Sequence, residues 1–102
     1  MKYQLLLQFP LDENFDFDAL IGLETELRFR LGNAHVVDGH TIGTDAASIL
    51  VNTDDPDIAF QKAISLLAGP LASTLKAAYR KTDSDQYHWL HPANTEEVFR
   101  PA

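Results

Sequence analysis

The chain has 102 residues, of which 45% are hydrophobic and 23% are charged, and this profile predicts one soluble globular domain. It contains no cysteine, which excludes disulfides, thiolate metal sites and a cysteine nucleophile. A net charge of −7 repels phosphate backbones, so we expect no nucleic-acid partner. No apolar run approaches the ~18 residues of a membrane span, and the N-terminus lacks a signal-peptide pattern. We therefore expect a cytoplasmic protein.

The negative charge is concentrated in the first part of the chain. Residues 1–60 hold eleven acids and three bases, a balance of −8, whereas residues 61–102 hold four acids and five bases, a balance of +1. This asymmetry favours a basic partner or a cation. Solubility alone is the simpler explanation of the acidic composition.

The first two predicted elements are a strand and a helix. Residues 3–9 carry apolar side chains on both faces, which favours an interior strand, and Pro10 ends it. Residues 16–31 have apolar side chains at helical spacing. Asp16 is suited to cap the start of this helix, and Gly32 to end it.

Two strands, over residues 34–42 and 46–53, are predicted next. Asp38-Gly39 is a strong two-residue hairpin signal, but a turn there would leave a very short first strand. We therefore place the turn at residues 43–45 and interpret Gly39 as a bulge or close-approach glycine within the strand.

The second half of the chain predicts one more helix and two more strands. Asp55 and Pro56 fit the N-cap and first turn of a helix that continues to Leu67 and is broken at Gly69-Pro70. The two strands are expected over residues 74–81 and, after a turn, over residues 86–90.

This β-α-β-β-α-β order predicts an α+β fold of the ferredoxin-like plait type. Right-handed crossovers would place two helices on one face of an antiparallel sheet, with a possible extra C-terminal strand. We expect a single domain over residues 1–92 and a C-terminal tail over residues 93–102. The open sheet face would carry aromatic side chains, from which we expect a homodimer or a docking surface. These partner-binding candidates are Tyr79, Tyr87 and Trp89.

The clearest candidate for chemistry is the pair Asp38 and His40. At positions i and i+2 of a regular strand the two side chains share a face, and a carboxylate beside an imidazole can prepare a general base. The same residues, with His35 brought near by a bulge, are also candidates for metal ligands. The structural alternative is a hydrogen-bonded pair that closes a hairpin, and it is favoured because no third ligand or nucleophile lies nearby in sequence. No cofactor is predicted.

Four short motifs together resemble a family of small, uncharacterised bacterial proteins of about this length. They are VDGH at 37–40, Gly43, TDDP at 53–56 and AAYRK at 77–81. The chain departs from that pattern at Thr41, where an acid is expected, and at residues 45–48, where a Gly-Glu-x-Asn segment is expected. The resemblance implies a plait-like fold without an established activity. By analogy at the level of the fold alone, some similar plait-like proteins are regarded as immunity or toxin-associated proteins.

Two functions follow as hypotheses. The first is a non-enzymatic module that binds a protein, for example an immunity-like protein that recognises a basic partner through its acidic half or its sheet. The second is a small enzyme or metal-dependent protein that uses Asp38 and His40. The sequence favours the first.

Overall fold

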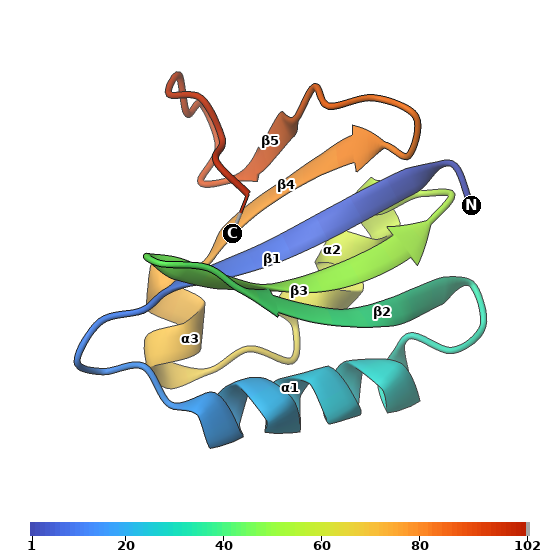
Figure 1. Ribbon diagram of the computed structural model, residues 1–102. Helices are drawn as coiled ribbons and strands as arrows, with labels where there is room; N and C mark the ends of the chain where they lie inside the picture. The colour runs from blue at the N-terminus through green and yellow to red at the C-terminus, as the bar shows by residue number, and fades with distance from the viewer. Residues whose placement is uncertain (102) are drawn as a thin grey trace.

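The structure is a computed structural model that describes residues 1–101, apart from the side chain of Pro70, as an α+β fold with one sheet (Figure 1). Its elements follow one another along the chain as β1 (Tyr3–Pro10), α1 (Phe17–Arg30), β2 (His35–Ile42), β3 (Ala46–Thr53), α2 (Pro56–Ile64), α3 (Gly69–Thr74), β4 (Lys76–Lys81) and β5 (His88–His91). All neighbouring strands are antiparallel, in the order β2-β3-β1-β4-β5.

Strand β1 lies at the centre of the sheet, as its apolar character on both faces predicts. It pairs with β3 on one side and with β4 on the other. Leu5 and Leu7 belong to the main core on the helix side, whereas Leu6 belongs to a smaller cluster on the opposite face. A strand buried on both faces needs apolar side chains on both, which is why the alternation is interrupted at Leu6.

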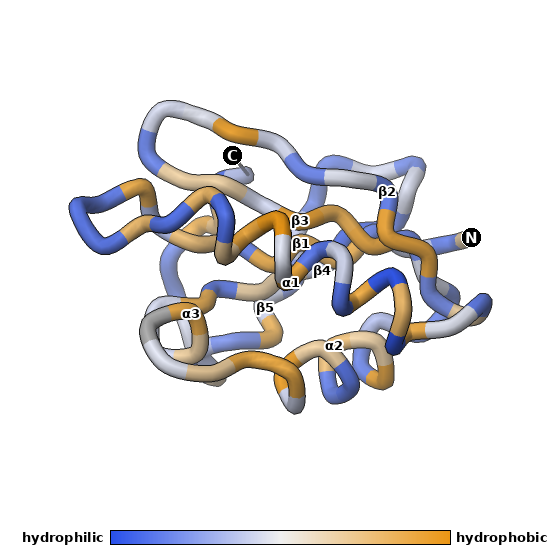
Figure 2. The backbone as a smooth tube through the Cα atoms, turned by 90° about the horizontal axis from the view of Figure 1, so that it is seen from below, coloured by the Kyte–Doolittle hydropathy of each residue, from blue (hydrophilic) through white to orange (hydrophobic). Residues whose placement is uncertain are grey.

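The helices cover one face of the sheet. Figure 2, seen from the helix side, shows α1, α2 and α3 in front of the strands. Leu20 and Leu27 of α1 are fully buried against the strands, and so are Ala59 and Ala63 of α2. This layer order follows from burying the apolar stripe of each helix on the apolar face of the sheet.

Both long helices begin where their capping residues predict. The Asp16 carboxylate accepts hydrogen bonds from the backbone N–H of Asp18 and Ala19 at the start of α1. The Asp55 carboxylate accepts from Ile58 N–H, with Pro56 in the first turn of α2. These bonds satisfy N–H groups that have no partner inside the helix.

The prediction of two helices is wrong in number, because the described chain has a third. Gly69-Pro70, interpreted from sequence as the break after the second helix, instead begins the short helix α3. The reason is that proline is accepted in the first turn of a helix as readily as it ends the preceding one. Helix α2 ends earlier than predicted, at Ile64, and Leu67 lies beyond the end of the helix and packs beside the core.

No helix among residues 1–101 is long and apolar enough to cross a membrane.

Candidate functional site

A bulge in β2 separates the two residues predicted as a pair, Asp38 and His40. Val37 and Gly39 occupy consecutive ladder positions against β3, so Asp38 between them is an extra residue. Gly39 has a φ of +116°, a conformation that favours glycine. The bulge reverses the alternation of the strand: His40, opposite Ile49, faces the helix layer, while Asp38 is exposed. The predicted turn and bulge are confirmed, and the shared face of Asp38 and His40 is not.

The carboxylate bonded to His40 comes instead from helix α1. Glu24 Oε2 lies 2.8 Å from His40 Nδ1, and Glu24 Oε1 accepts a 3.0 Å hydrogen bond from Arg28. The side chain of Glu24 is only 5% exposed. The ring of Phe17 meets the His40 ring edge-on, with centroids 5.8 Å apart. Glu24 thus joins α1 to the edge strand β2, with both carboxylate oxygens engaged.

This arrangement gives His40 a defined orientation. A carboxylate accepts hydrogen bonds and does not donate them, so the Nδ1 of His40 carries the proton toward Glu24. In the neutral ring Nε2 then holds a lone pair. Such a pair can act as a base if a substrate is held beside Nε2. The cleft described below is not lined by His40, Glu24 or Asp38.

His35 is buried at the other end of β2 and has a different partner. Its Nδ1 lies 2.7 Å from the hydroxyl of Thr53, which also accepts the backbone N–H of Asp55. Burial lowers the pKa of His35 below 6.5, the charge of Lys62 lowers it further, and Asp55 acts in the opposite direction. His35 therefore favours its neutral form and ties β2 to the end of β3.

The three candidates for metal ligands, His35, Asp38 and His40, are not brought together. Within residues 1–101 there is no group of three histidine, aspartate or glutamate side chains placed to hold a metal ion. His35 and His40 both face the helix layer, as a bulge permits, but they bond to Thr53 and Glu24 respectively.

The aromatic candidates are divided between the two faces of the sheet. Tyr87 and Trp89 lie on the face away from the helices, where both rings contact Phe99. Tyr79 is paired with Leu5 and faces the helix side, against the rings of Tyr3 and His88. The aromatic face from which a homodimer was expected is thus covered, in part, by residues of the same chain.

A cleft of about 690 Å³ opens at one end of the molecule, between the β1–α1 loop and α3. Its apolar lining includes buried Phe9 and half-buried Phe15 and Leu71. The exposed carboxylates of Asp12 and Asp16 also line it, and no lysine or arginine is among its described lining residues. The cleft therefore combines an apolar interior with negative charge.

The acidic residues of the cleft are held by local hydrogen bonds. Asp12 accepts from the N–H of Asn14 at 2.9 Å, which forms a tight turn before α1. Asp16 caps α1 with one of its oxygens. Leu11 N–H donates to the carbonyl of Asp45, which ties this loop to the β2–β3 turn. These hydrogen bonds hold the β1–α1 loop in a defined conformation along one side of the cleft.

The chain was compared with models of protein families, with curated proteins and with solved structures. None of the three comparisons found a match. The proposals below therefore depend on geometry and charge, and the family resemblance stays a prediction.

Sequence reasoning missed Glu24 and the cleft. Glu24 could have been found, because it lies four residues after Leu20 and three before Leu27, on the core stripe of α1. A charged residue at such a position requires a buried partner. The cleft had no such signal, since α3 was not predicted and forms one of its walls.

Proposed function

We propose that this protein is a non-enzymatic binding module that holds a basic, partly apolar segment of another protein in the cleft between the β1–α1 loop and α3. The observation that carries the proposal is the composition of the cleft: apolar side chains such as Phe9 and Leu71, with the carboxylates of Asp12 and Asp16. A volume of about 690 Å³ is in the range of pockets that bind specific ligands.

The charge of the whole chain supports a basic partner. The balance of −8 over residues 1–60 includes both acidic residues of the cleft. Such a field raises the association rate of a positively charged segment and contributes specificity. Apolar side chains of that segment would supply most of the affinity by leaving water. An immunity-like protein that binds a basic toxin domain is one concrete form of this function.

We also propose that residues 3–81 form a ferredoxin-like plait. The order β2-β3-β1-β4, with β1 and β3 central and α1 and α2 on one face, supports this assignment. Strand β5 is then an addition at the β4 edge, and α3 an insertion that builds the cleft.

Binding of a labelled synthetic peptide tests the proposed function. The probe is a short peptide of alternating leucine and lysine, and the same peptide with glutamate in place of lysine is its control. We expect the lysine peptide to bind and the glutamate peptide not to bind. Added salt should weaken the binding, because it screens exposed charges.

A pair of double variants tests whether the cleft is the site. D12N/D16N keeps the local hydrogen-bonding geometry but removes two charges, and it should weaken binding about 2- to 30-fold, since exposed pairs contribute about 0.2–1 kcal/mol each. D83N/D85N removes two exposed charges from the β4–β5 loop, at the opposite end from α3 (Figure 1), and should leave the affinity unchanged. Equal losses in the two variants would refute the cleft as the binding site.

A second candidate function, general-base chemistry, is favoured by the contact between Glu24 and His40. In this version Glu24 replaces Asp38 as the orienting acid, and Nε2 of His40 accepts the proton. NMR of the ring nitrogens tests it: the neutral ring should be the Nδ1–H tautomer in the wild type and lose that preference in E24A. A wild-type ring with the proton on Nε2 would end this candidate.

A further inference from the structure

The sheet face away from the helices is covered by the end of the chain. The C-terminal segment, residues 92–101, crosses this face and inserts Phe99, which is 5% exposed, against Leu6 and Ala78. The Phe99 ring lies 5.1 Å from the rings of both Tyr87 and Trp89, measured between centroids. One aromatic side chain thus fills an apolar patch that β1, β4 and β5 form together.

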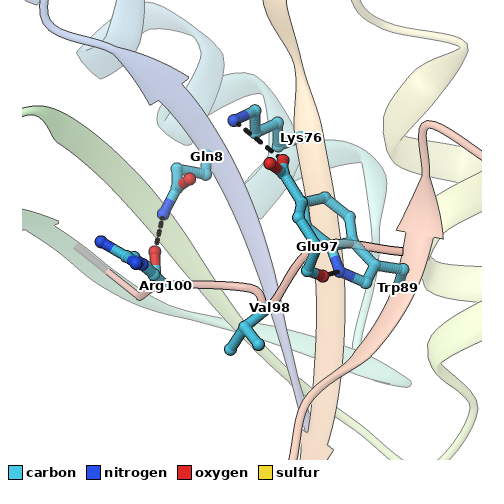
Figure 3. Close-up of a pocket in the computed structure, with 6 residues that line it drawn as sticks. All are labelled: Gln8, Lys76, Trp89, Glu97, Val98 and Arg100. Carbon is cyan, nitrogen blue, oxygen red and sulfur yellow. Dashed lines mark hydrogen bonds and ion pairs between the residues drawn. The ribbon is translucent and has the colours of Figure 1, made fainter. Parts of the chain in front are cut away.

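The polar contacts of the C-terminal segment are made mainly by its backbone (Figure 3). Trp89 Nε1–H donates to the carbonyl of Glu97, and Gln8 Nε2 donates to the carbonyl of Arg100, both at 2.7 Å. The remaining polar contact shown is an ion pair of 3.6 Å between Lys76 and the Glu97 side chain. A surface that donates hydrogen bonds to the backbone carbonyls of an extended segment, and also accepts one anchoring side chain, has the features of a peptide-binding surface.

One buried polar group on this face, the hydroxyl of Ser48, lacks a hydrogen bond among the described residues. Ser48 lies opposite Gln8 in the sheet and is fully buried. A buried hydroxyl without a partner destabilises the folded state. The C-terminal segment is therefore an imperfect occupant, and a segment with a polar group that reaches Ser48 would be a better one.

We propose that this face is a second docking surface, for an extended segment of a partner protein that carries one aromatic side chain. The C-terminal segment occupies the surface in the absence of the partner and is displaced by it. The partner's aromatic ring takes the place of Phe99, and its backbone carbonyls accept from Gln8 and Trp89. This inference is independent of the cleft, because the cleft lies on the helix side.

The test uses the full chain with Trp89, its single tryptophan, as the reporter. In F99A we expect the Trp89 emission to shift to longer wavelength, because water reaches the ring. A synthetic peptide with the sequence of residues 92–102 should reverse this shift in a saturable manner, and the same peptide with alanine in place of the phenylalanine should not. V98A is the matched control: Val98 is 81% exposed and does not belong to the buried cluster around Phe99, so its emission should shift much less than that of F99A.

Binding of the labelled peptide to the wild type tests the displacement itself. The wild type should bind the peptide more weakly than F99A does, because its own segment competes for the same surface. Equal affinities, or a peptide that fails to reverse the F99A shift, would overturn the proposal.

A measurement on the wild type alone covers the case in which F99A does not fold. The Trp89 indole proton should exchange with solvent faster than the core amides of β1, since displacement of the segment frees it without global unfolding. Exchange of both at the rate of global unfolding would mean that the segment is a fixed part of the fold and is not displaced.

Discussion

The carboxylate of Glu24 on α1 bonds to the ring of His40 on β2 at 2.8 Å, so the edge strand is tied to the helix layer by a buried acid. The bulge at Gly39 makes this contact possible, because it turns His40 toward the helices. Without the extra residue in the ladder, regular alternation would place His40 on the opposite face, where Glu24 is out of reach.

We predict that H40A destabilises the protein by about 1–3 kcal/mol, because Glu24 then keeps Arg28 as its remaining polar partner and one buried oxygen loses its donor. Urea unfolding followed by circular dichroism measures the change. The matched control is D38A, which alters an exposed residue outside the ladder and should stay within about 0.5 kcal/mol of the wild type.

A double-mutant cycle of H40A and E24A measures the contact itself, and the coupling energy between the two residues should be about 0.5–3 kcal/mol. A coupling of zero would mean that the contact contributes nothing to stability.

Features encoded by neighbouring residues were predictable from the sequence. The caps at Asp16 and Asp55 act within three residues, and the strand character of β1 is visible in its own eight residues. The bulge at Gly39 followed from weighing strand length against turn chemistry, again a local argument. Each of these signals acts on the backbone within a few residues of itself, so the sequence alone is enough to predict the feature.

Features that depend on distant partners were not predictable in the same way. The carboxylate partner of His40 comes from sixteen residues away, and Gln8 bonds to Arg100 across ninety-two. The docking of Phe99 on Leu6 likewise depends on the sheet order, which brings β1 beside β4. No periodicity encodes such pairings, because each requires the assembled sheet.

We predict that stability falls below pH 6.5 in part because of His35. Its pKa is lowered in the folded state, chiefly by burial. Below pH 6.5 the unfolded chain therefore takes up a proton that the folded chain does not, and the free energy of unfolding decreases as the pH falls. Well above pH 6.5 both states are neutral at this residue and the effect disappears.

The measurement is urea unfolding at a series of pH values, for the wild type and H35L. The leucine variant cannot titrate, so the difference in unfolding free energy between the two proteins should change between pH 6.5 and the lower folded-state pKa, and stay constant above pH 7. Carboxylates that do not interact with His35 contribute equally to both proteins and cancel in this difference. A difference that is flat over the whole acid range would refute the assignment of the pH effect to His35.

We predict opposite effects for alanine at two glycines that both have open space around them. At Gly39 the backbone has a φ of +116°, and no heavy atom lies within 4 Å of an added Cβ. G39A should therefore destabilise by about 1–3 kcal/mol through backbone strain alone. At Gly22, within α1, an added Cβ also meets nothing within 4 Å, and φ is ordinary for a helix. G22A should stabilise by about 0.4–1 kcal/mol. Thermal and urea unfolding of both variants check the signs, and a stabilising G39A would exclude the strained bulge.

Asp16 has two roles, as the cap of α1 and as a negative charge in the cleft, and two substitutions separate them. D16A removes both roles, whereas D16N removes the charge and keeps an oxygen that can accept from Asp18 and Ala19. We predict that D16A lowers the free energy of unfolding by about 0.5–2 kcal/mol and that D16N lowers it less, by the loss of the favourable charge at the helix start. Both variants should weaken binding of the lysine-leucine peptide to the same extent, because both lose the carboxylate charge. If affinity instead followed stability, with D16N binding like the wild type, the charge of Asp16 would have no part in recognition.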